Sequence, residues 1–267
     1  MNKKRVVFCT YPSLYSSLVL KKLLADDAID VVGIIRSTRV LNPKYNIIVS
    51  HFKQIKLTGW RYSIYMFFVT DIFAVLSGLS RNKKIKTIQA YAKLQGIPVC
   101  DTQDVNKIES IDFIKDMNAD VLLAAHFNQL VKAPVFDLND LEFLNIHPSL
   151  LPDYKGVDPV FYALLKGEKD IGVSIHEMLE AFDTGDIHRQ KAFSCDQSDN
   201  VFSHNCRLFE VGAELAIDVI KKERSKGIKQ KEGNYDSWPN AKLVKDLKKK
   251  SYKLINLSAF FKQIFKK

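Results

Sequence analysis

The stretch RVVFCTYPSLYSSLVLKKLLADDAIDVVGII, residues 5–35, decides the fold class. A β-rich run at residues 5–10 is followed by a segment whose leucines recur at helix spacing, and a second β-rich run follows at 29–35. Strand, helix and strand at this spacing predict a right-handed βαβ unit in a parallel sheet. We therefore expect an α/β, Rossmann-like fold: a parallel-rich twisted sheet with helices on both faces.

The same alternation continues along the chain. The run at 120–125 is continuously apolar, as in a strand covered on both faces, whereas 173–178 alternates like a half-exposed strand. The further elements expected are helix 85–94 ending at Gly96, strand 97–100, helix 105–117, strand 120–125, strand 144–146, strand 173–178 and helix 202–221.

Length and composition predict a main domain with a small appendage. We place the main domain at 1–226, with a helical insertion at 40–83, because the strand and helix rhythm pauses there and then resumes. Residues 227–267 form a basic C-terminal appendage, since about 40 residues seldom sustain a core of their own.

The charge balance favours an anionic partner. Lys and Arg number 40 against 30 Asp and Glu, which gives a net charge of +10 and suits a phosphorylated substrate, tRNA or a membrane surface. The four cysteines lack CxxC spacing, so we expect no metal site and no disulfide framework, and a reduced, cytoplasmic compartment. The apolar run at 6–10 is too short for an export signal.

A strongly apolar segment at residues 62–76 leaves three interpretations open. A spanning helix needs about 20 apolar residues with few charges, and this run is shorter and contains Asp71. An interfacial helix would give contact with a membrane surface through residues 60–79. A buried helix or a contact between the subunits of a homo-oligomer is the third interpretation.

Candidate catalytic residues occur in LNIHPSLLPDYKG, residues 144–156, and FDTGDI, residues 182–187. Asn145 and His147 are two positions apart, so on an extended strand their side chains point to the same face. Asp183 begins a turn-prone Asp-Thr-Gly segment, from which a carboxylate can point back at a neighbouring site. Taken singly, each segment also occurs as an ordinary strand or turn.

Together these three residues fit acyl transfer to an amine, in which the carbonyl oxygen gains negative charge. Asn145 and a protonated His147 would donate hydrogen bonds to that oxygen, and loss of one such donor costs about 2.7–4 kcal/mol in well-studied enzymes. Asp183 would stabilise the imidazolium and raise the pKa of His147, which keeps the ring an acid near neutral pH. The proton shed by the amine would pass to Asp183 through a water, or to His147.

The segment NIHPSLLP, residues 145–152, resembles the signature of the folate-dependent formyltransferases. That family includes methionyl-tRNA formyltransferase, glycinamide ribonucleotide formyltransferase, the amino-sugar nucleotide formyltransferases and formyltetrahydrofolate hydrolase. DTGD at 183–186 resembles the second motif of the family, and the resemblance extends over most of residues 84–215. It implies 10-formyltetrahydrofolate as the donor and Asn145, His147 and Asp183 as the catalytic trio.

By the same resemblance, residues 126–130 lie where the backbone of the family hydrogen-bonds the pterin ring, and Leu144 with loop 179–182 completes an apolar pocket. The cofactor-binding residues implied are His126, Phe127, Asn128, Gln129, Leu130, Leu144, Leu179, Glu180, Ala181 and Phe182. We expect His126 to be a packed loop histidine and not a catalyst. Packing roles are also expected for His51, His176, His188 and His204.

Departures from the family pattern reduce the range of expected amine acceptors. The ribonucleotide-specific branch has a glycine-rich phosphate loop after its first strand, whereas TYPSLYSS at 10–17 has no glycine that would let the backbone approach a phosphate. The tRNA-specific branch carries a C-terminal β-barrel, for which 227–267 is too short. We therefore expect a small amine, such as an amino-sugar nucleotide, whose diphosphate suits the positive charge.

Other interpretations stay open. Methionyl-tRNA formyltransferase is the main alternative, followed by formyltetrahydrofolate hydrolase and a non-catalytic folate-binding module, since a fold alone does not establish an activity. The insertion at 40–83 lies outside the family core, and we expect it to cap the acceptor site or to mediate dimerisation.

Overall fold

The computed structural model describes residues 3–41, 47–79, 83–138, 140–196, 198–222 and 226–265. Its strands are β1 Lys4–Thr10, β2 Ile29–Ser37, β3 Val99–Thr102, β4 Val121–Ala125, β5 Glu142–His147, β6 Lys155–Gly156, β7 Asp170–Glu177, β8 Ile187–Ser194 and β9 Tyr235–Asp236. Its helices are α1 Leu14–Leu23, α2 Ile47–Thr58, α3 Trp60–Phe67, the π-helical turn η1 Phe68–Ile72, α4 Phe73–Leu79, α5 Ile88–Gln95, α6 Ile108–Asp116, α7 Ala133–Phe136, α8 Pro159–Lys166, α9 Val201–Lys221, α10 Ala241–Lys249 and α11 Leu257–Ile264.

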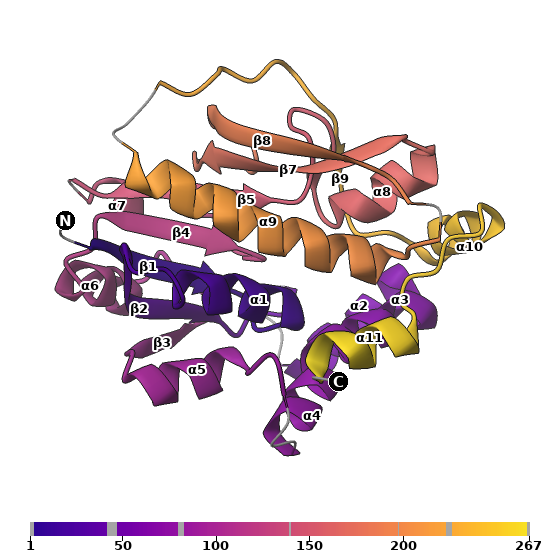
Figure 1. The fold of residues 1–267 in the computed structure, drawn as a ribbon, viewed down its shortest axis with the longest axis horizontal. Coiled ribbons are helices and arrows are strands. Elements are labelled where there is room, and N and C mark those ends of the chain that lie inside the picture. Colours follow the sequence, from indigo (N-terminus) through magenta and orange to yellow (C-terminus); the bar gives the residue numbers. More distant parts are fainter. Residues whose placement is uncertain are drawn as a thin grey trace.

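The described strands form one large sheet and one two-stranded pair (Figure 1). The large sheet has the order β3-β2-β1-β4-β5-β7-β8, and β6 pairs with β9. Strands β3, β2, β1, β4 and β5 are parallel, whereas β7 and β8 join the edge antiparallel. The predicted α/β fold is therefore confirmed. The strand order reverses between β1 and β4, and in such sheets the crevice at this point, beyond the carboxyl ends of the strands, is the usual ligand site.

Alternating side chains of β1 serve two cores. Val6 and Phe8 belong to the larger core, which α1 and α9 cover on the face seen in Figure 1. Val7 and Cys9 point to the other face and pack in a smaller core with residues of α6 and α7. A strand buried on both faces needs apolar residues at every position, which explains the continuous apolar run of β1.

Capping residues set the ends of the helices. Ser13 caps α1, and its side chain and that of Ser16 form a reciprocal capping box. Asn200 caps α9 through the N–H of Ser203. The predicted end of a helix at Gly96 is confirmed, because this residue closes α5 in the left-handed conformation with φ of 66°.

Strand β7 differs from the prediction of a half-exposed strand, because Ile171 to His176 are all buried. The second face of β7 is covered by the loop that follows β5. Ser174 Oγ donates to the carbonyl of Ser149 at 2.6 Å and accepts from the N–H of Leu151 at 3.1 Å. The loop therefore both leads out of β5 and shields its neighbour.

Residues 47–79, the larger described part of the expected insertion, form the helices α2, α3, η1 and α4, which pack beside the C-terminal helices (Figure 1). Tyr62 and Phe73 belong to the larger core, and the rings of Phe68 in η1 and Phe260 in α11 lie 5.4 Å apart. Apolar residues of α10 and α11 are part of the same core. The described helices of the insertion and of the C-terminal segment thus pack on α1, α8 and α9 and on each other, while a domain boundary near residue 226 stays a prediction.

Candidate active site

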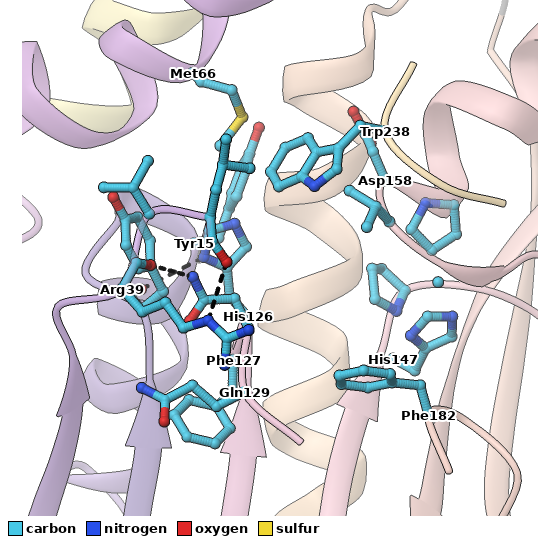
Figure 2. A pocket seen from close by; sticks show the side chains of 18 of the residues that line it. Tyr15, Arg39, Met66, His126, Phe127, Gln129, His147, Asp158, Phe182 and Trp238 are labelled. Carbon is cyan, nitrogen blue, oxygen red and sulfur yellow. Dashed lines mark hydrogen bonds between the residues drawn. The ribbon is translucent and has the colours of Figure 1, made fainter. Parts of the chain in front are cut away.

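A cavity of about 750 Å³ opens at the carboxyl ends of β4 and β5. Figure 2 shows two walls facing each other across it. We call one the loop wall, which consists of Arg39 and residues 126–130. The other is the carboxylate wall, which consists of Asn145, His147, Asp158, His176 and Asp183.

The structure brings together the three residues predicted as a catalytic trio. Asn145 and His147 lie on the same face of β5, as their spacing predicts. Asp183 reaches both: its Oδ1 lies 3.3 Å from His147 Nδ1 and accepts from Asn145 Nδ2 at 3.4 Å. All three line the cavity.

The N–H of Gly156 holds the carboxylate of Asp183, and a second glycine, Gly185, lies two residues further along the same segment. Asp183 itself has a positive φ of 56°, and its Oδ2 accepts the N–H of Gly156 at 2.9 Å. Gly156 has φ of 96°, and a Cβ there would collide with the carbonyl of Asp236. A Cβ on Gly185 would likewise collide with the backbone of Glu177. Both positions therefore require glycine. At either position a side chain would collide with nearby backbone, and at Gly156 the positive φ is an additional reason.

Asp183 is negatively charged across the ordinary pH range. Burial by itself raises the pKa of this carboxyl, but His147, His176 and the N–H of Gly156 outweigh burial and lower the pKa to about 2. A buried anion is thus present beside the two imidazole rings.

The pKa of His147 corrects the expectation that Asp183 would keep this ring an acid near neutral pH. Burial lowers the pKa of His147 below its usual value, and Asp183 offsets only part of that effect. The Nε2–H donates to the carbonyl of Tyr154 at 3.0 Å, and Nδ1 faces the Asp183 carboxylate. Both ring nitrogens therefore face acceptors. In the neutral ring Nε2 carries the proton, so Nδ1, which faces Asp183, can take up a further proton.

His176 belongs to the carboxylate wall, although the sequence predicted only a packing role. It lies directly opposite Asn145 in the β5–β7 pairing. Asn145 Nδ2 donates to His176 Nε2 at 3.0 Å, and His176 Nδ1–H donates to the carbonyl of Glu177 at 2.6 Å. Its Nε2 is also 3.6 Å from Asp183 Oδ1. No local signal marked this residue, because its neighbours depend on the strand register.

Amide side chains anchor the loop wall from within. Gln129 Nε2 donates to Ser37 Oγ at 2.8 Å and to the carbonyl of Thr102 at 3.1 Å, while its Oε1 accepts the N–H of Val105 at 2.7 Å. Ser37 Oγ also donates to Asn128 Oδ1 at 2.6 Å. The backbone of the loop is thereby tied to the ends of β2 and β3.

His126 is a packed loop histidine, as expected. Its ring centroid lies 5.6 Å from that of Tyr15 and 5.9 Å from that of Phe209, and its Nδ1 is 3.2 Å from Ser13 Oγ. Burial lowers the pKa of His126 to about 4, so the ring is neutral at pH 7.

Most of the residues implied for folate binding line the cavity, and two do not. Those that line it are His126, Phe127, Asn128, Gln129, Leu130, Leu179, Ala181 and Phe182. Leu144 lies completely buried in the core, where β5 packs in the middle of the sheet. Glu180 is exposed at the tip of its loop, because a charged side chain there remains hydrated.

A second polar group in the cavity was not predicted. Asp158 accepts from Tyr62 Oη at 2.8 Å and from Asn205 Nδ2 at 3.4 Å, and Tyr65 Oη lies 2.7 Å from Tyr15 Oη. Burial raises the pKa of the Asp158 carboxyl. Two of these tyrosines come from α3, so the insertion contributes directly to the lining of the cavity.

The formyl transferase family model matches residues 64–220, more than half of the chain. The chain belongs to the formyl transferase family. The family resemblance predicted from residues 145–152 and 183–186 is thus confirmed. Within the described residues, no group of three or more His, Cys, Asp or Glu is arranged to hold a metal ion.

The chain is similar to several curated methionyl-tRNA formyltransferases. The methionyl-tRNA formyltransferase of Ehrlichia ruminantium is 34% identical over 133 residues, 50% of this chain and 44% of that protein. That of Thermotoga maritima is 30% identical over 168 residues, 63% of this chain and 54% of that protein. The chain thus spans about half the length of these curated relatives.

Among solved structures, the N-formyltransferase of Helicobacter canadensis, in complex with folinic acid and dTDP-3-aminofucose, is similar with a TM-score of 0.55. The match covers 88% of this chain and 71% of that one at 18% identity. It shows a shared fold.

Proposed function

We propose that this chain is an enzyme that transfers a formyl group from 10-formyltetrahydrofolate to a primary amine of a small, anionic acceptor. The observation that carries the proposal is the cluster of buried His147 with half-buried Asn145 and Asp183 at the edge of a 750 Å³ cavity. Membership of the formyl transferase family supports it. The cavity volume is in the range typical of small-molecule sites.

The loop wall suits the donor. A pterin is a flat ring with a donor and acceptor edge, and main-chain groups between apolar walls hold such a ring well. Residues 126–130 supply an anchored backbone, and Figure 2 shows Phe127 and Phe182 on opposite sides of the cavity. We assign the pterin to the space between them.

The carboxylate wall suits the reaction. As the amine nitrogen bonds to the formyl carbon, the carbonyl oxygen becomes negative, and an amide N–H aimed at it lowers the barrier. Asn145 has one N–H on His176 at 3.0 Å and a weaker contact of 3.4 Å to Asp183, so the second N–H can turn to that oxygen at little cost. His147 accepts the amine proton, because it is neutral and Asp183 then stabilises the imidazolium.

The lining of the cavity offers one cation and several aromatic surfaces to a compact acceptor. Arg39 provides a cation on the loop wall, and Trp60, Tyr235 and Trp238 provide aromatic surfaces. An amino-sugar nucleotide combines an amine, a flat base and a diphosphate. The structure from Helicobacter canadensis contains dTDP-3-aminofucose, and a dTDP-linked amino sugar of that size is the first acceptor to test.

Methionyl-tRNA is the second candidate acceptor, because the curated relatives carry that name and the chain has a net charge of +10. Phosphate contacts with tRNA release counterions, so binding to tRNA would weaken steeply as salt rises. A nucleotide-linked sugar makes fewer such contacts and depends less on salt.

Mass spectrometry after incubation with 10-formyltetrahydrofolate tests the proposal. The acceptor panel contains amino-sugar nucleotides, charged initiator tRNA and glycinamide ribonucleotide. We expect a formyl group on an amino-sugar nucleotide. Formylation of tRNA alone would favour the second candidate, and folate turnover without an acceptor would indicate a hydrolase.

A pair of histidine variants distinguishes a loss of catalysis from a general effect on folding. His147→Ala should lose transfer by about a thousandfold, since it removes the group that receives the proton. His188→Ala is the matched control, because His188 lies on β8 and does not line the cavity. Near-normal turnover in His147→Ala would contradict the mechanism, and no formylation of any acceptor by the wild type would contradict the function.

A further inference from the structure

Exposed apolar side chains are concentrated in the insertion. Among the described residues, eighteen large apolar side chains are exposed, and ten of them lie between residues 47 and 79. These are Ile48, Val49, Phe52, Ile55, Leu57, Trp60, Ile64, Phe67, Val75 and Leu79. We call this set the insertion surface. Exposed apolar side chains concentrated in one segment of a folded protein point to an interaction site.

Helix α2 is turned the opposite way from an ordinary surface helix. Its Ser50, Gln54 and Thr58 face the protein and are only 2%, 9% and 0% exposed. Ile48 and Phe52, which face outward, are 70% and 75% exposed. In water a surface helix buries its apolar stripe and exposes its polar one. The orientation of α2 therefore indicates an apolar or interfacial environment outside it.

The cavity accounts for only part of the insertion surface. Ile55, Trp60, Ile64 and Phe67 line the cavity, so a bound acceptor would cover some of their area. The other six members of the surface do not line it. A small molecule in the cavity leaves them exposed.

The apolar stretch 60–79 lies along the protein and does not leave it. By length and composition it is one helix that could cross a membrane, with 20 residues and a mean hydropathy of 1.6. However, Tyr62, Tyr65, Val69 and Phe73 recur at helix spacing and are buried along its length. One face is thus committed to the core, which leaves the opposite face to lie in a membrane surface.

Charge distinguishes the possible occupants of the insertion surface. Residues 47–79 contain Lys53, Lys56 and Arg61 but only one acid, Asp71. A symmetric contact with a second copy would bring two surfaces of the same net positive charge together, which is unfavourable. An anionic bilayer offers apolar depth and negative charge together.

We propose that the insertion surface binds the surface of an anionic lipid bilayer, with the apolar side chains of α2 and α4 inserted among the lipids and the cations at the headgroups. Trp60 fits this placement, since tryptophan prefers the boundary between lipid and water. Because four members of the surface also line the cavity, its mouth then lies at the level of the headgroups. Binding to the bilayer does not depend on the proposed transfer reaction.

Flotation of the full chain with lipid vesicles tests this proposal. One set of vesicles contains phosphatidylcholine alone, and the other contains equal parts of phosphatidylcholine and phosphatidylglycerol. We expect the protein to float with the second set far more than with the first, and to be released partly by high salt.

Two variants and a control locate the contact. The triple variant Ile48→Ser/Phe52→Ser/Leu79→Ser should weaken binding about a hundredfold, because three inserted side chains are lost. Lys56→Glu/Arg61→Glu should weaken binding to the anionic vesicles about tenfold or more. The control Leu94→Ser/Ile108→Ser/Ile228→Ser removes comparably exposed side chains elsewhere and should bind like the wild type. None of these residues lines the cavity.

Three outcomes would overturn the proposal. The first is that the wild type fails to float with anionic vesicles, and the second is that the triple variant floats as well as the control. The third is a wild-type dimer in analytical ultracentrifugation that the triple variant converts to a monomer, with no vesicle binding by either. That last result would assign the insertion surface to a second copy of the chain.

Discussion

The loop wall and the carboxylate wall face the same cavity but use their polar groups differently. On the loop wall, Gln129 forms its hydrogen bonds with Ser37, Thr102 and Val105, all of which belong to the surrounding frame. On the carboxylate wall, Asn145 and Asp183 form most of theirs with other members of the wall. The loop wall is thus anchored to the surrounding frame by an amide side chain, whereas the carboxylate wall is held by contacts among its own polar and charged side chains.

Burial also has opposite results on the two walls. The pKa of His126 falls to about 4, because burial disfavours the charged ring and no carboxylate compensates. The pKa of Asp183 falls to about 2, because His147 and His176 outweigh burial. His126 on the loop wall is therefore a neutral group of fixed position, whereas Asp183 supplies negative charge to the carboxylate wall. Substitutions on the two walls should separate donor binding and stability from turnover.

The largest effect is expected from Asp183→Ala. Loss of the anion removes the partner of His147 and should lower kcat about a thousandfold or more, with little change in the KM for the donor. Asp186→Ala is the matched control, because Asp186 belongs to the same segment but does not line the cavity. Steady-state kinetics measures both. A rise in the KM for the donor without a fall in kcat would show that Asp183 acts in donor binding, which would contradict the division of roles between the two walls.

A smaller effect is expected from the pair Asn145 and His176. Asn145→Ala should lower kcat about a hundredfold, and His176→Ala about tenfold, because we expect His176 to act mainly by positioning Asn145 through the 3.0 Å hydrogen bond. The double variant should then be no slower than Asn145→Ala alone. If the two effects multiply in a double-mutant cycle, His176 acts independently and is not a positioning residue.

Gln129→Ala should act on stability and donor binding instead. It leaves the buried N–H of Val105 without its partner, which costs about 1–3 kcal/mol in the free energy of unfolding. The KM for the donor should rise while kcat changes little. Gln103→Ala, at an exposed position, is the control. Unchanged stability in urea unfolding would show that the amide does not anchor the loop wall.

The smallest effect is the pH dependence of stability contributed by His126. Its folded pKa of about 4 is below the ordinary value of 6.5, so the unfolded state binds a proton that the folded state does not. Stability should thus decrease as pH falls from 6.5 towards 4, by up to about 2 kcal/mol for this partly exposed residue.

Urea unfolding at pH 7 and pH 4.5 measures this decrease. His126→Gln should lose less stability between the two values than the wild type. Asp183 does not interfere, because its stabilising contribution is lost only as pH falls below 3.8 towards 2. Equal losses in the two proteins would show that His126 is not the neutral group inferred for the loop wall.

Local patterns predicted much of the fold and part of the site. The parallel strands follow from their continuous apolar runs, and the shared face of Asn145 and His147 follows from their spacing on one strand. Asp183 and Gly185 were recognisable as a turn. These features depend on neighbours in sequence, which the chain displays directly.

Other parts of the site depend on contacts between distant segments. His176 meets Asn145 through the register of β5 and β7, and Tyr62 meets Asp158 across 96 positions. The burial of β7 comes from the loop after β5. The low pKa of His147 likewise follows from how deeply the ring is buried, which spacing does not reveal.

By itself, the sequence determined the α/β class and the strand that carries Asn145 and His147, because periodicity and spacing are local properties, and the resemblance of residues 145–152 and 183–186 indicated the family. Only the tertiary structure decided which titratable groups share the cavity, the sign of the pKa shift at His147, and that α2 turns its polar stripe inward. A helical pattern shows two unlike faces, but which face is buried depends on what the rest of the chain packs against it.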